Sequence, residues 1–287
     1  MAAAAVVGAA AAGPAPAPAP APAPAAAAAP APAPAAAAAD GVGLEARRAT
    51  TTSARVRKGP VRPTLRWEKA LLAEGRVTVI GCDEVGRGAI AGPVAVGVAA
   101  VTIDIGRVPA GLADSKLLTP ARREALVPHV EAWATTAVGM ASAGVVDQDG
   151  IMVALGLAGS RAIDALVAAG VSLDGAVVVL DGSYDWLTSA LRDPLDVMVR
   201  VKADRDCASV AAASVVAKVR RDAVMVRAHD AAPHYAWNSN KGYGSTAHYD
   251  GIRRNGPHGL HRTTWLHPRE DESSSAASTD GGGRIAP

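Results

Sequence analysis

The stretch VTVIGCDEVGRGAIAGPVAVGVAAVTI (77–103) holds two runs of valine and isoleucine separated by a glycine-rich loop. Short runs of β-branched residues that are bounded by glycine and proline are typical of strands. We therefore predict two adjacent strands, over 77–85 and 93–103, joined as a hairpin through the loop 86–92.

The chain on either side of this hairpin indicates one α/β domain over 76–269, of ~190 residues. Thr119 followed by Pro120 is a typical helix start, and Gly170 is a typical helix end. The elements expected after the hairpin are a helix over 120–133, a strand over 133–143, a helix over 150–170, strands over 176–182 and 195–204, and a helix over 208–229. Pro128 should kink or shorten the first of these helices. The pattern predicts a mixed central sheet flanked by helices.

The two ends of the chain differ from this domain in composition. Residues 1–66 open with alternating alanine and proline, which favours an extended, solvated arm, and residues 270–287 are typical of a disordered tail. A basic run joins the arm to the first strand and consists of Arg47, Arg48, Arg55, Arg57, Lys58, Arg62 and Arg66. Such a run can hold phosphates or form a solvated linker.

The composition of the chain argues against several classes of protein. The net charge of +2 is too small to indicate a nucleic-acid binder by itself. Prolines interrupt the apolar N-terminal segment, which argues against a membrane span and a secretory signal. Cys82 and Cys207 are too few for a disulfide framework and are expected to be reduced thiols. We predict a cytoplasmic protein without a membrane partner, and we expect a monomer.

Three carboxylates stand at or near the ends of the predicted strands. Asp83 lies within the first strand, Asp181 follows AVVVL, and Asp204 follows VMVRVKA. A buried ionised carboxylate needs a cation or a strong donor nearby. Because sites in open α/β sheets form at the carboxyl ends of strands, the three acids should converge, and an all-oxygen pocket suits Mg²⁺ or Mn²⁺. Two such ions can clamp the attacking and leaving oxygens of a phosphoryl displacement.

Glu84 adjoins Asp83 and should point to the opposite face of the strand, since neighbouring side chains alternate. Both acids can reach one cluster if the strand bends at Glu84, which Gly86 and Gly88 would permit, or if a main-chain carbonyl joins the coordination. Glu84 is therefore the fourth candidate in this cluster.

A dinucleotide-binding loop is the alternative for the same stretch. Gly86, Gly88 and Ala91 match G-x-G-x-x-G/A after a strand, and Asp104 follows at a plausible distance. The match is weak, because the residues after the loop indicate a strand instead of a helix. The two acids before the loop would also place negative charge against a pyrophosphate.

Several blocks of the sequence together resemble ribonuclease HII, the type 2 ribonuclease H family. They follow the order of that family and are GCDEVGRGAIAGPVAVGVAAV (81–101), LADSKLLT (112–119), VVVLDG (177–182), VKADRDCASVAAASVVAKVRRD (201–222), NKGYGSTAHYDGI (240–252) and HRTTW (261–265). The resemblance implies a ribonuclease H-like fold with a helical C-terminal portion. It also implies metal-dependent hydrolysis of RNA in RNA/DNA hybrids and incision 5′ to single ribonucleotides in duplex DNA, leaving a 3′-hydroxyl and a 5′-phosphate.

The resemblance also assigns roles to individual residues. It makes the catalytic and metal-binding acids Asp83, Glu84, Asp181 and Asp204, with two Mg²⁺ or Mn²⁺ ions. Recognition of the ribonucleotide 2′-hydroxyl and its phosphate falls to Gly86, Arg87 and Gly88, and stacking on the sugar at the RNA-to-DNA junction falls to Tyr243. Lys116 and Lys218 resemble family lysines near substrate phosphates. Two alternatives are a surface role for Tyr243 and a helix pair between Lys218 and Asp222.

Two positions depart from the family, with Ala203 where glycine is common and Trp265 where phenylalanine is common. The HGLH segment (258–261) could suggest zinc, but no cysteine or acid ligands accompany it, and we expect a structural role for His261. The alternatives for function are a non-catalytic hybrid-binding protein and a ribonuclease HIII-like enzyme. Expected partners are RNA/DNA hybrids and ribonucleotide-containing duplex DNA, with a replication or repair protein as a further candidate.

Overall fold

A computed structural model describes residues 62–266 of the chain. The Ala/Pro-rich arm, the basic run up to Lys58 and the tail predicted over 270–287 lie outside the described residues.

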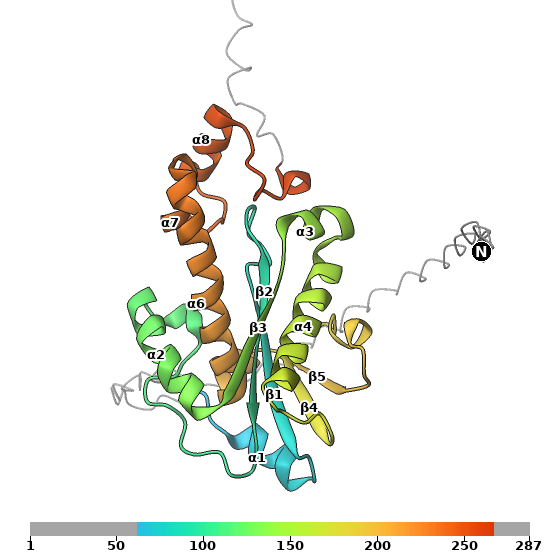
Figure 1. The fold of residues 1–287 in the computed structure, drawn as a ribbon. Coiled ribbons are helices and arrows are strands. Elements are labelled where there is room, and N and C mark those ends of the chain that lie inside the picture. The colour runs from blue at the N-terminus through green and yellow to red at the C-terminus, as the bar shows by residue number, and fades with distance from the viewer. Residues whose placement is uncertain (1–61, 267–287) are drawn as a thin grey trace, which may run out of the picture. The chain divides into compact units, whose positions relative to one another are not determined.

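The centre of the fold is a five-stranded mixed sheet with the order β3-β2-β1-β4-β5 (Figure 1). Its strands are β1 Thr78–Val85, β2 Val94–Val101, β3 Thr135–Ala141, β4 Ala176–Asp181 and β5 Asp196–Arg200. β2 pairs antiparallel with both β1 and β3, whereas β4 runs parallel to β1 and β5 parallel to β4. The predicted hairpin and mixed sheet are confirmed. Because β2 follows the glycine-rich loop, the helix that a dinucleotide-binding loop requires is replaced by a strand.

Helices cover both faces of this sheet, as Figure 1 shows for α6 and α4. The helices are α1 Arg66–Ala73, α2 Pro120–Trp133, α3 Ala143–Asp149, α4 Ile151–Ala168, α5 Ala203–Asp206, α6 Ala208–Ala231, α7 Trp237–Asn240 and α8 Thr246–Asn255. Single 3₁₀ turns are η1 Ser115–Leu117, η2 Thr188–Ala190, η3 Pro233–Tyr235 and η4 Thr263–Trp265. One hydrophobic core lies between the sheet and α6, α2 and α1, and a second lies between the sheet and α4.

Helix α6 lies unusually close to β1 and β2, as its run of alanine and serine predicts. A Cβ atom on Gly81 would lie 2.2 Å from the carbonyl carbon of Ser209, and a Cβ atom on Gly97 would lie 2.3 Å from the carbonyl oxygen of Ala213. Only glycine at these two strand positions leaves room for the helix backbone. This contact fixes the position of α6 relative to the part of β1 that carries Asp83.

Helix α4 is, among the described residues, long and apolar enough to cross a membrane by length and composition only. Core helices of globular domains pass the same test, and half of α4 is buried inside this fold. Its helical spacing predicts one apolar face of Ile151, Leu155, Ala158, Ala162 and Leu166; all of these are buried except Ile151, at the start of the helix, which is partly buried.

Helices α2 and α1 differ from the predicted elements. Helix α2 runs through Pro128 to Trp133, so the shortening expected at this proline is wrong. Pro128 is exposed, which lets water satisfy the carbonyl that loses its helical hydrogen bond. Helix α1 was not predicted and extends the described fold to before residue 76. Leu71 and Leu72 pack into the core, and the Oε1 atom of Glu68 accepts a hydrogen bond from the backbone N–H of Ser209 at 2.8 Å, at the start of α6.

Candidate active site

Asp83 lies near the end of β1 on the face that α6 covers. Side chains two apart on a strand share a face, and Gly81 faces α6. The Asp83 side chain is buried, with 3% of its surface exposed, and its Oδ1 atom accepts a hydrogen bond from the backbone N–H of Glu84 at 2.8 Å. The carboxylate therefore sits at the sheet edge but beneath the surface.

Asp181 is the last residue of β4, the strand that runs parallel to β1. Parallel strands end at the same edge of a sheet, which brings Asp181 beside Asp83. Its Oδ1 atom accepts hydrogen bonds from the backbone N–H groups of Ala203 at 2.7 Å and Asp204 at 3.4 Å. Asp181 thus caps the start of the short helix α5 and holds Asp204 next to itself.

Asp204 belongs to α5 and not to the end of a strand, so its predicted position on a strand over 195–204 is wrong. β5 ends at Arg200, and Lys202 turns the chain with a left-handed backbone (φ 62°). Asp204 is buried, and its Oδ2 atom accepts a hydrogen bond from the Nζ atom of Lys116 at 3.0 Å. The predicted convergence with Asp181 nevertheless holds, through the cap of α5.

Glu84 lies in an uninterrupted part of β1, since the pairing with β2 continues to Val85 and Ala95. The strand therefore does not bend at Glu84, and its side chain starts from the face opposite Asp83. Its nearest cation is Arg87, with 3.6 Å between Oε1 and Nη1. Two ways were expected to bring residue 84 into the cluster, a bend of the strand or coordination by a main-chain carbonyl. The structure does not show the strand bend.

The acids influence one another electrostatically. Burial raises the pKa of Asp83 to about 8, although a hydrogen bond from Ser214 opposes this rise, and the charges of Glu84 and Asp181 add to it. Burial also raises the pKa of Glu84, against the lowering effect of Arg87. Burial and the charge of Asp204 raise the pKa of Asp181. The site therefore concentrates negative charge that its own donors and cations leave incompletely compensated.

The donor set fits hard divalent cations, which prefer carboxylate and water oxygens. Within residues 62–266, no three His, Cys, Asp or Glu side chains lie close enough together to hold a metal ion. Asp204 is instead turned to Lys116, and Glu84 to Arg87. Burial is the main cause of the raised pKa values, and mutual repulsion adds to it; a divalent ion would relieve that repulsion, so the chemistry of the residues suits it. The acids lie near one another, but in the described part of the chain they do not form a complete set of metal ligands.

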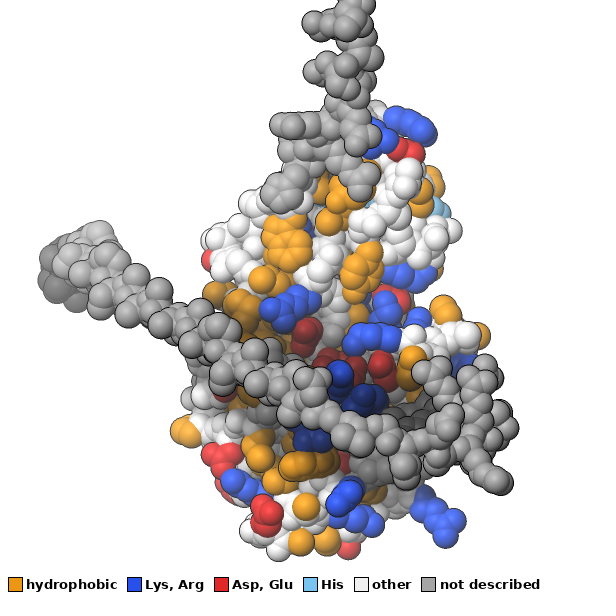
Figure 2. All heavy atoms as spheres, turned by 180° about the vertical axis from the view of Figure 1, so that it is seen from behind, with side chains coloured by type: hydrophobic (Ala, Val, Ile, Leu, Met, Phe, Trp, Pro, Cys, Tyr) orange, Lys and Arg blue, Asp and Glu red, His pale blue; other side chains and the backbone are white. Residues whose placement is uncertain are grey.

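A cavity of about 400 Å³ lies against two of the acids, Asp181 and Asp204. Basic side chains share its wall, among them Lys116, Lys202 and Arg205. Figure 2 shows this mixture of charges, with acidic side chains gathered near the centre of one face and Lys and Arg side chains around them. Such a surface can accept a phosphate backbone while bringing it to carboxylates.

Lys116 contributes a cation that reaches this cavity. Burial lowers the pKa of its ammonium, but the hydrogen bond and charge of Asp204, with the charges of Asp83 and Asp114, outweigh burial and raise the pKa. Its side chain is 73% exposed, so it stays charged and accessible.

The glycine-rich loop between β1 and β2 has a buried base and an open tip. Gly86 has a left-handed backbone (φ 82°), and a Cβ atom there would lie 2.8 Å from the Nε atom of Arg221. Arg87 and Gly88 are exposed, and nothing lies within 4 Å of a Cβ atom built on Gly88. In the described part of the chain, the backbone N–H groups of Arg87 and Gly88 have no hydrogen-bond partner. The tip therefore offers free donors to a ligand.

Tyr243 lies in a second loop, between α7 and α8, that touches the first. The backbone N–H groups of Ile90 and Ala91 both donate to the carbonyl of Gly242, at 2.9 and 3.0 Å. The Tyr243 ring is 37% exposed, and the Nζ atom of Lys218 lies 5.5 Å from its centroid. The structure thus brings Tyr243 beside the glycine-rich loop.

Lys218 forms the helix pair with Asp222 that the spacing allows. Its Nζ atom donates to Oδ1 of Asp222 at 2.9 Å, and its side chain is only 19% exposed. Burial lowers its pKa, and Asp222 opposes this. The helix pair between Lys218 and Asp222 is therefore present. Lys218 is largely buried and also lies near the Tyr243 ring, so this pair is not simply a surface pair.

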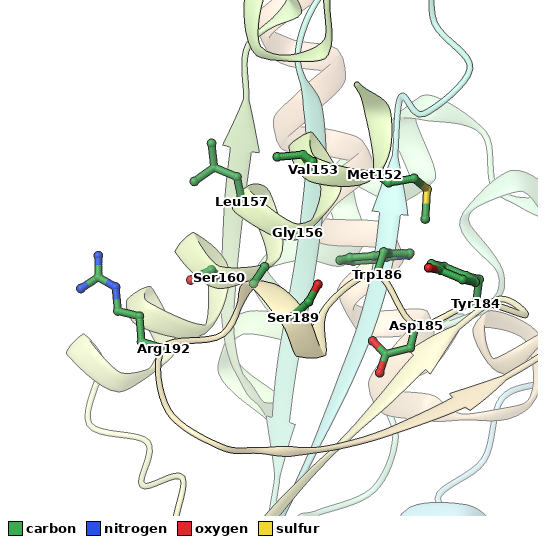
Figure 3. Close-up of a pocket in the computed structure, with 11 residues that line it drawn as sticks. Met152, Val153, Gly156, Leu157, Ser160, Tyr184, Asp185, Trp186, Ser189 and Arg192 are labelled. Atoms are coloured by element: carbon green, nitrogen blue, oxygen red, sulfur yellow. The ribbon is translucent and has the colours of Figure 1, made fainter. Parts of the chain in front are cut away.

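A larger hollow, of about 500 Å³, lies beside α4 and the segment that follows β4 (Figure 3). Met152 and Val153 line it from α4, and Tyr184, Asp185 and Trp186 line it from the other wall. None of the four predicted acids lines this hollow. The smaller acidic cavity is therefore the candidate site.

The comparison with known proteins now decides the family. The family model for ribonuclease HII matches residues 80–267. The chain is also 40% identical over 238 residues to ribonuclease HII of Streptomyces griseus, which covers 78% of this chain and 96% of that protein. The chain belongs to the ribonuclease HII family. It is accordingly a ribonuclease H, a nuclease that hydrolyses phosphodiester bonds.

Solved structures share the fold of this ribonuclease HII. The structure of the complex of PCNA with ribonuclease HII from Archaeoglobus fulgidus aligns with a TM-score of 0.51 and 24% identity, covering 65% of this chain and 93% of that one. The crystal structure of Bst ribonuclease HIII in complex with Mn²⁺ aligns with a TM-score of 0.52 and 24% identity, covering 65% of each chain. The predicted ribonuclease H-like fold is thereby confirmed.

Sequence reasoning missed several residues that support the site of this ribonuclease HII. Ser214 donates to Asp83, and Arg221 and Arg262 bond to loop carbonyls. His248 bonds to the carbonyl of Tyr243 at 2.9 Å. Ser214 lies within the small-residue run of α6, which carries no sign of a polar role. Arg221 and Arg262 contact backbone atoms far along the chain, and His248 contacts a carbonyl five residues away, so no pair of side chains marks these contacts in the sequence.

Proposed function

We propose that this ribonuclease HII cleaves the RNA strand of RNA/DNA hybrids and incises duplex DNA 5′ to a single embedded ribonucleotide, leaving a 3′-hydroxyl and a 5′-phosphate. One observation carries this proposal. The coupled acids at the ends of β1 and β4 lie at the base of a loop whose tip has free backbone donors and adjoins an exposed tyrosine.

Asp83, Glu84, Asp181 and Asp204 would hold two divalent ions. When bound, such ions supply Lewis-acid chemistry, lowering the pKa of water and neutralising charge on the leaving 3′-oxygen. The Mn²⁺ complex of Bst ribonuclease HIII supports divalent metal use in this fold. The preference between Mg²⁺ and Mn²⁺ belongs to the proposal.

The chain's own residues would supply orientation and selectivity. The free N–H groups of Arg87 and Gly88 would bond to the sugar and phosphate of the ribonucleotide, because the open space at Gly88 admits a close approach. Tyr243 would stack against the sugar at the junction. Lys116 and Lys218 would attract the neighbouring phosphates. None of these contacts reads a base edge, so incision would be independent of sequence.

The proposal is tested by Asp181→Asn, with Asp196→Asn as the matched control. Asn retains the hydrogen bonds to the backbone of α5 but removes the charge at the acidic edge. We expect cleavage of a hybrid to fall by on the order of 1,000-fold or more while hybrid binding remains measurable. Asp196 lies at the opposite, N-terminal end of β5 and is exposed, so its variant should cleave normally. Retained turnover in Asp181→Asn would refute the assignment of the acids.

A further inference from the structure

His261 and Arg262, near the end of the described part of the chain, are adjacent and buried, with 2% and 0% of their surfaces exposed. Their side chains contact different loops. Arg262 reaches the glycine-rich loop 86–92, and His261 reaches the loop that carries Tyr243, through His248. This arrangement concerns the two loops to which the proposed function assigns substrate recognition.

Arg262 bonds to three carbonyls of the glycine-rich loop. Its Nη2 atom donates to the carbonyls of Gly86 at 2.8 Å and Gly92 at 3.1 Å, and its Nη1 atom donates to the carbonyl of Arg87 at 2.8 Å. Among the described residues, no carboxylate lies within ion-pair distance of this guanidinium. The charge of Arg262 is therefore directed to the loop backbone, and the fork geometry of arginine lets one side chain hold both ends of the loop.

The backbone of the same segment adds to this attachment. The N–H of Arg262 donates to the carbonyl of Ile90 at 2.9 Å, and the N–H of Gly92 donates to the carbonyl of Leu260 at 2.7 Å. Ala91 and His261 form an antiparallel bridge. Residues 260–262 thus act as a short extra strand along the glycine-rich loop.

His261 connects to Tyr243 through a chain of hydrogen bonds. The Nε1–H of Trp237 donates to Nε2 of His248 at 2.9 Å, which makes that nitrogen an acceptor. His248 must then carry its proton on Nδ1, from which it donates to the carbonyl of Tyr243 at 2.9 Å. The Nε2 atom of His261 lies 3.1 Å from Nε2 of His248.

The other ring nitrogen of His261 contacts the backbone of His258. Its Nδ1 atom lies 2.7 Å from the backbone nitrogen of His258, whose N–H points to it, and 3.2 Å from the carbonyl oxygen of the same residue. Both histidine rings therefore have hydrogen-bonding partners at both of their nitrogens. The network fixes the Tyr243 carbonyl relative to the same dipeptide that holds Gly86 and Arg87.

We infer that His261 and Arg262 are positioning residues that hold the glycine-rich loop and the Tyr243 loop in one register, and that this register sets the preference for a single ribonucleotide over a continuous RNA strand. The inference rests on the proposed function. A single ribonucleotide offers one sugar that both loops must contact at once, whereas a continuous hybrid offers many equivalent sugars. Loss of the register should therefore weaken the first substrate more, because small misplacements of contacting groups cost large factors in rate.

The test compares Arg262→Lys with Arg161→Lys. Lysine keeps a positive charge but cannot donate to the three loop carbonyls in the geometry of a guanidinium. Arg161 is a matched control, since its Nη1 atom also donates to a backbone carbonyl, that of Met140 at 2.7 Å, away from both loops. For each variant, kcat/KM is measured on a duplex with one ribonucleotide and on a continuous hybrid. We expect the ratio of the two to fall ~10-fold or more in Arg262→Lys and to stay unchanged in Arg161→Lys.

A second set of variants covers a failure of Arg262→Lys to fold, which a thermal unfolding curve would reveal. His261→Gln keeps a polar group that can hydrogen-bond to His248, whereas His261→Leu removes it. We expect Gln to retain the substrate ratio and Leu to lower it. Adding Tyr243→Ala to His261→Leu should lower the ratio no further than Tyr243→Ala alone, because His261 acts through the Tyr243 loop.

Three outcomes are decisive. Equal losses on both substrates in folded Arg262→Lys and His261→Leu would overturn the inference and leave these residues a purely structural role. Additive losses of His261→Leu and Tyr243→Ala would overturn it as well. A wild-type enzyme that cleaves continuous hybrids but does not incise at a single ribonucleotide would instead overturn the proposed incision activity, and the inference with it.

Discussion

Burial raises the pKa of three of the acids, Asp83, Glu84 and Asp181, and the charges of neighbouring acids raise it further. A raised carboxyl pKa means that the charged form is disfavoured in the folded protein, so these side chains reduce its stability. Functional sites commonly hold such unfavourable charge, and the rest of the fold compensates for it. Ser214 and the backbone of α5 supply part of the compensation through hydrogen bonds. A residue that is essential for cleavage is therefore expected to reduce stability in the absence of metal.

Asp181→Asn should stabilise the metal-free protein. The substitution removes repulsion with Asp204 but keeps an oxygen that accepts from Ala203. We expect the free energy of unfolding in EDTA to rise, because the repulsion that helps to raise the pKa of Asp181 is lost. Chemical denaturation of the wild type and the variant in EDTA measures it. A decrease in stability would show that the Asp181 charge is favourable in the folded state.

Tyr243→Phe and Tyr243→Ala separate the ring from the hydroxyl. Stacking needs only the ring, so Phe should retain incision at a single ribonucleotide. Ala should reduce kcat/KM by ~10-fold or more, since the ring that positions the sugar is lost and small misplacements of contacting groups cost large factors in rate. The comparison is made on duplex DNA with one ribonucleotide. Equal rates for the wild type and Ala would remove Tyr243 from substrate recognition.

At the scale of elements, local patterns predicted most of the sheet and its two covering helices, and the failures have local causes. β5 ends early because Lys202 adopts a left-handed backbone, which nothing in the run of valines indicates. α1 is only eight residues long, and it is stabilised by its leucines in the core and by Glu68 at the start of α6, so its signal lies in tertiary contacts. Pro128 is tolerated because it faces solvent.

Because α6 packs so closely against β1, we expect a single methyl group added to β1 at this contact to lower the stability of the protein strongly. Gly81→Ala would place a Cβ atom 2.2 Å from the Ser209 backbone, which has no flexible end that can move aside. We expect destabilisation by about 3 kcal/mol or more. Gly106→Ala is the control, since nothing lies within 4 Å of its Cβ position. Thermal and chemical unfolding of both variants measure the difference, and equal stabilities would contradict the close packing of α6.

At the scale of the whole molecule, the site is assembled from segments far apart in the chain. The acids and the glycine-rich loop come from strands that sequence patterns could locate, so their candidate roles could be predicted. The supports of the loops could not be predicted, because Arg221 and Arg262 donate to backbone carbonyls more than a hundred residues away. Every residue has a backbone carbonyl, so a contact with a carbonyl does not restrict the residue type of the partner. The sequence therefore contains no pair of residue types that would indicate the contact.

The buried histidines are expected to lose their contribution to stability in acid. Burial, with the charges of His248, His258 and His234, lowers the pKa of His261 to about 4, although the backbone of His258 opposes this. Burial lowers the pKa of His248 as well. Because these pKa values lie below the ordinary 6.5, the histidines bind more protons in the unfolded chain between about pH 4 and 6.5, so their contribution to stability falls as the pH falls through this range. The raised pKa of Asp83, about 8, acts in the opposite direction, so the histidine contribution is measured as a difference between variants.

We expect His261 alone to reduce the free energy of unfolding by about 2 kcal/mol between pH 7 and pH 5. Asp147 has a lowered pKa and therefore contributes only below its ordinary value of 3.8, outside this range. Chemical denaturation across this pH range gives the slope for the wild type and for His261→Gln. A slope that is the same in both proteins would show that His261 does not titrate as a buried neutral ring.

The proposed incision activity is measured on a DNA duplex that carries one ribonucleotide, with products mapped at nucleotide resolution in the presence of Mg²⁺, Mn²⁺ or EDTA. We expect a single nick on the 5′ side of the ribonucleotide, with a 3′-hydroxyl and a 5′-phosphate, that requires a divalent metal. Cleavage of continuous hybrids alone would keep the acidic site but contradict the roles given to the glycine-rich loop and Tyr243. Tight binding without any cleavage would contradict the proposed activity and favour a hybrid-binding protein.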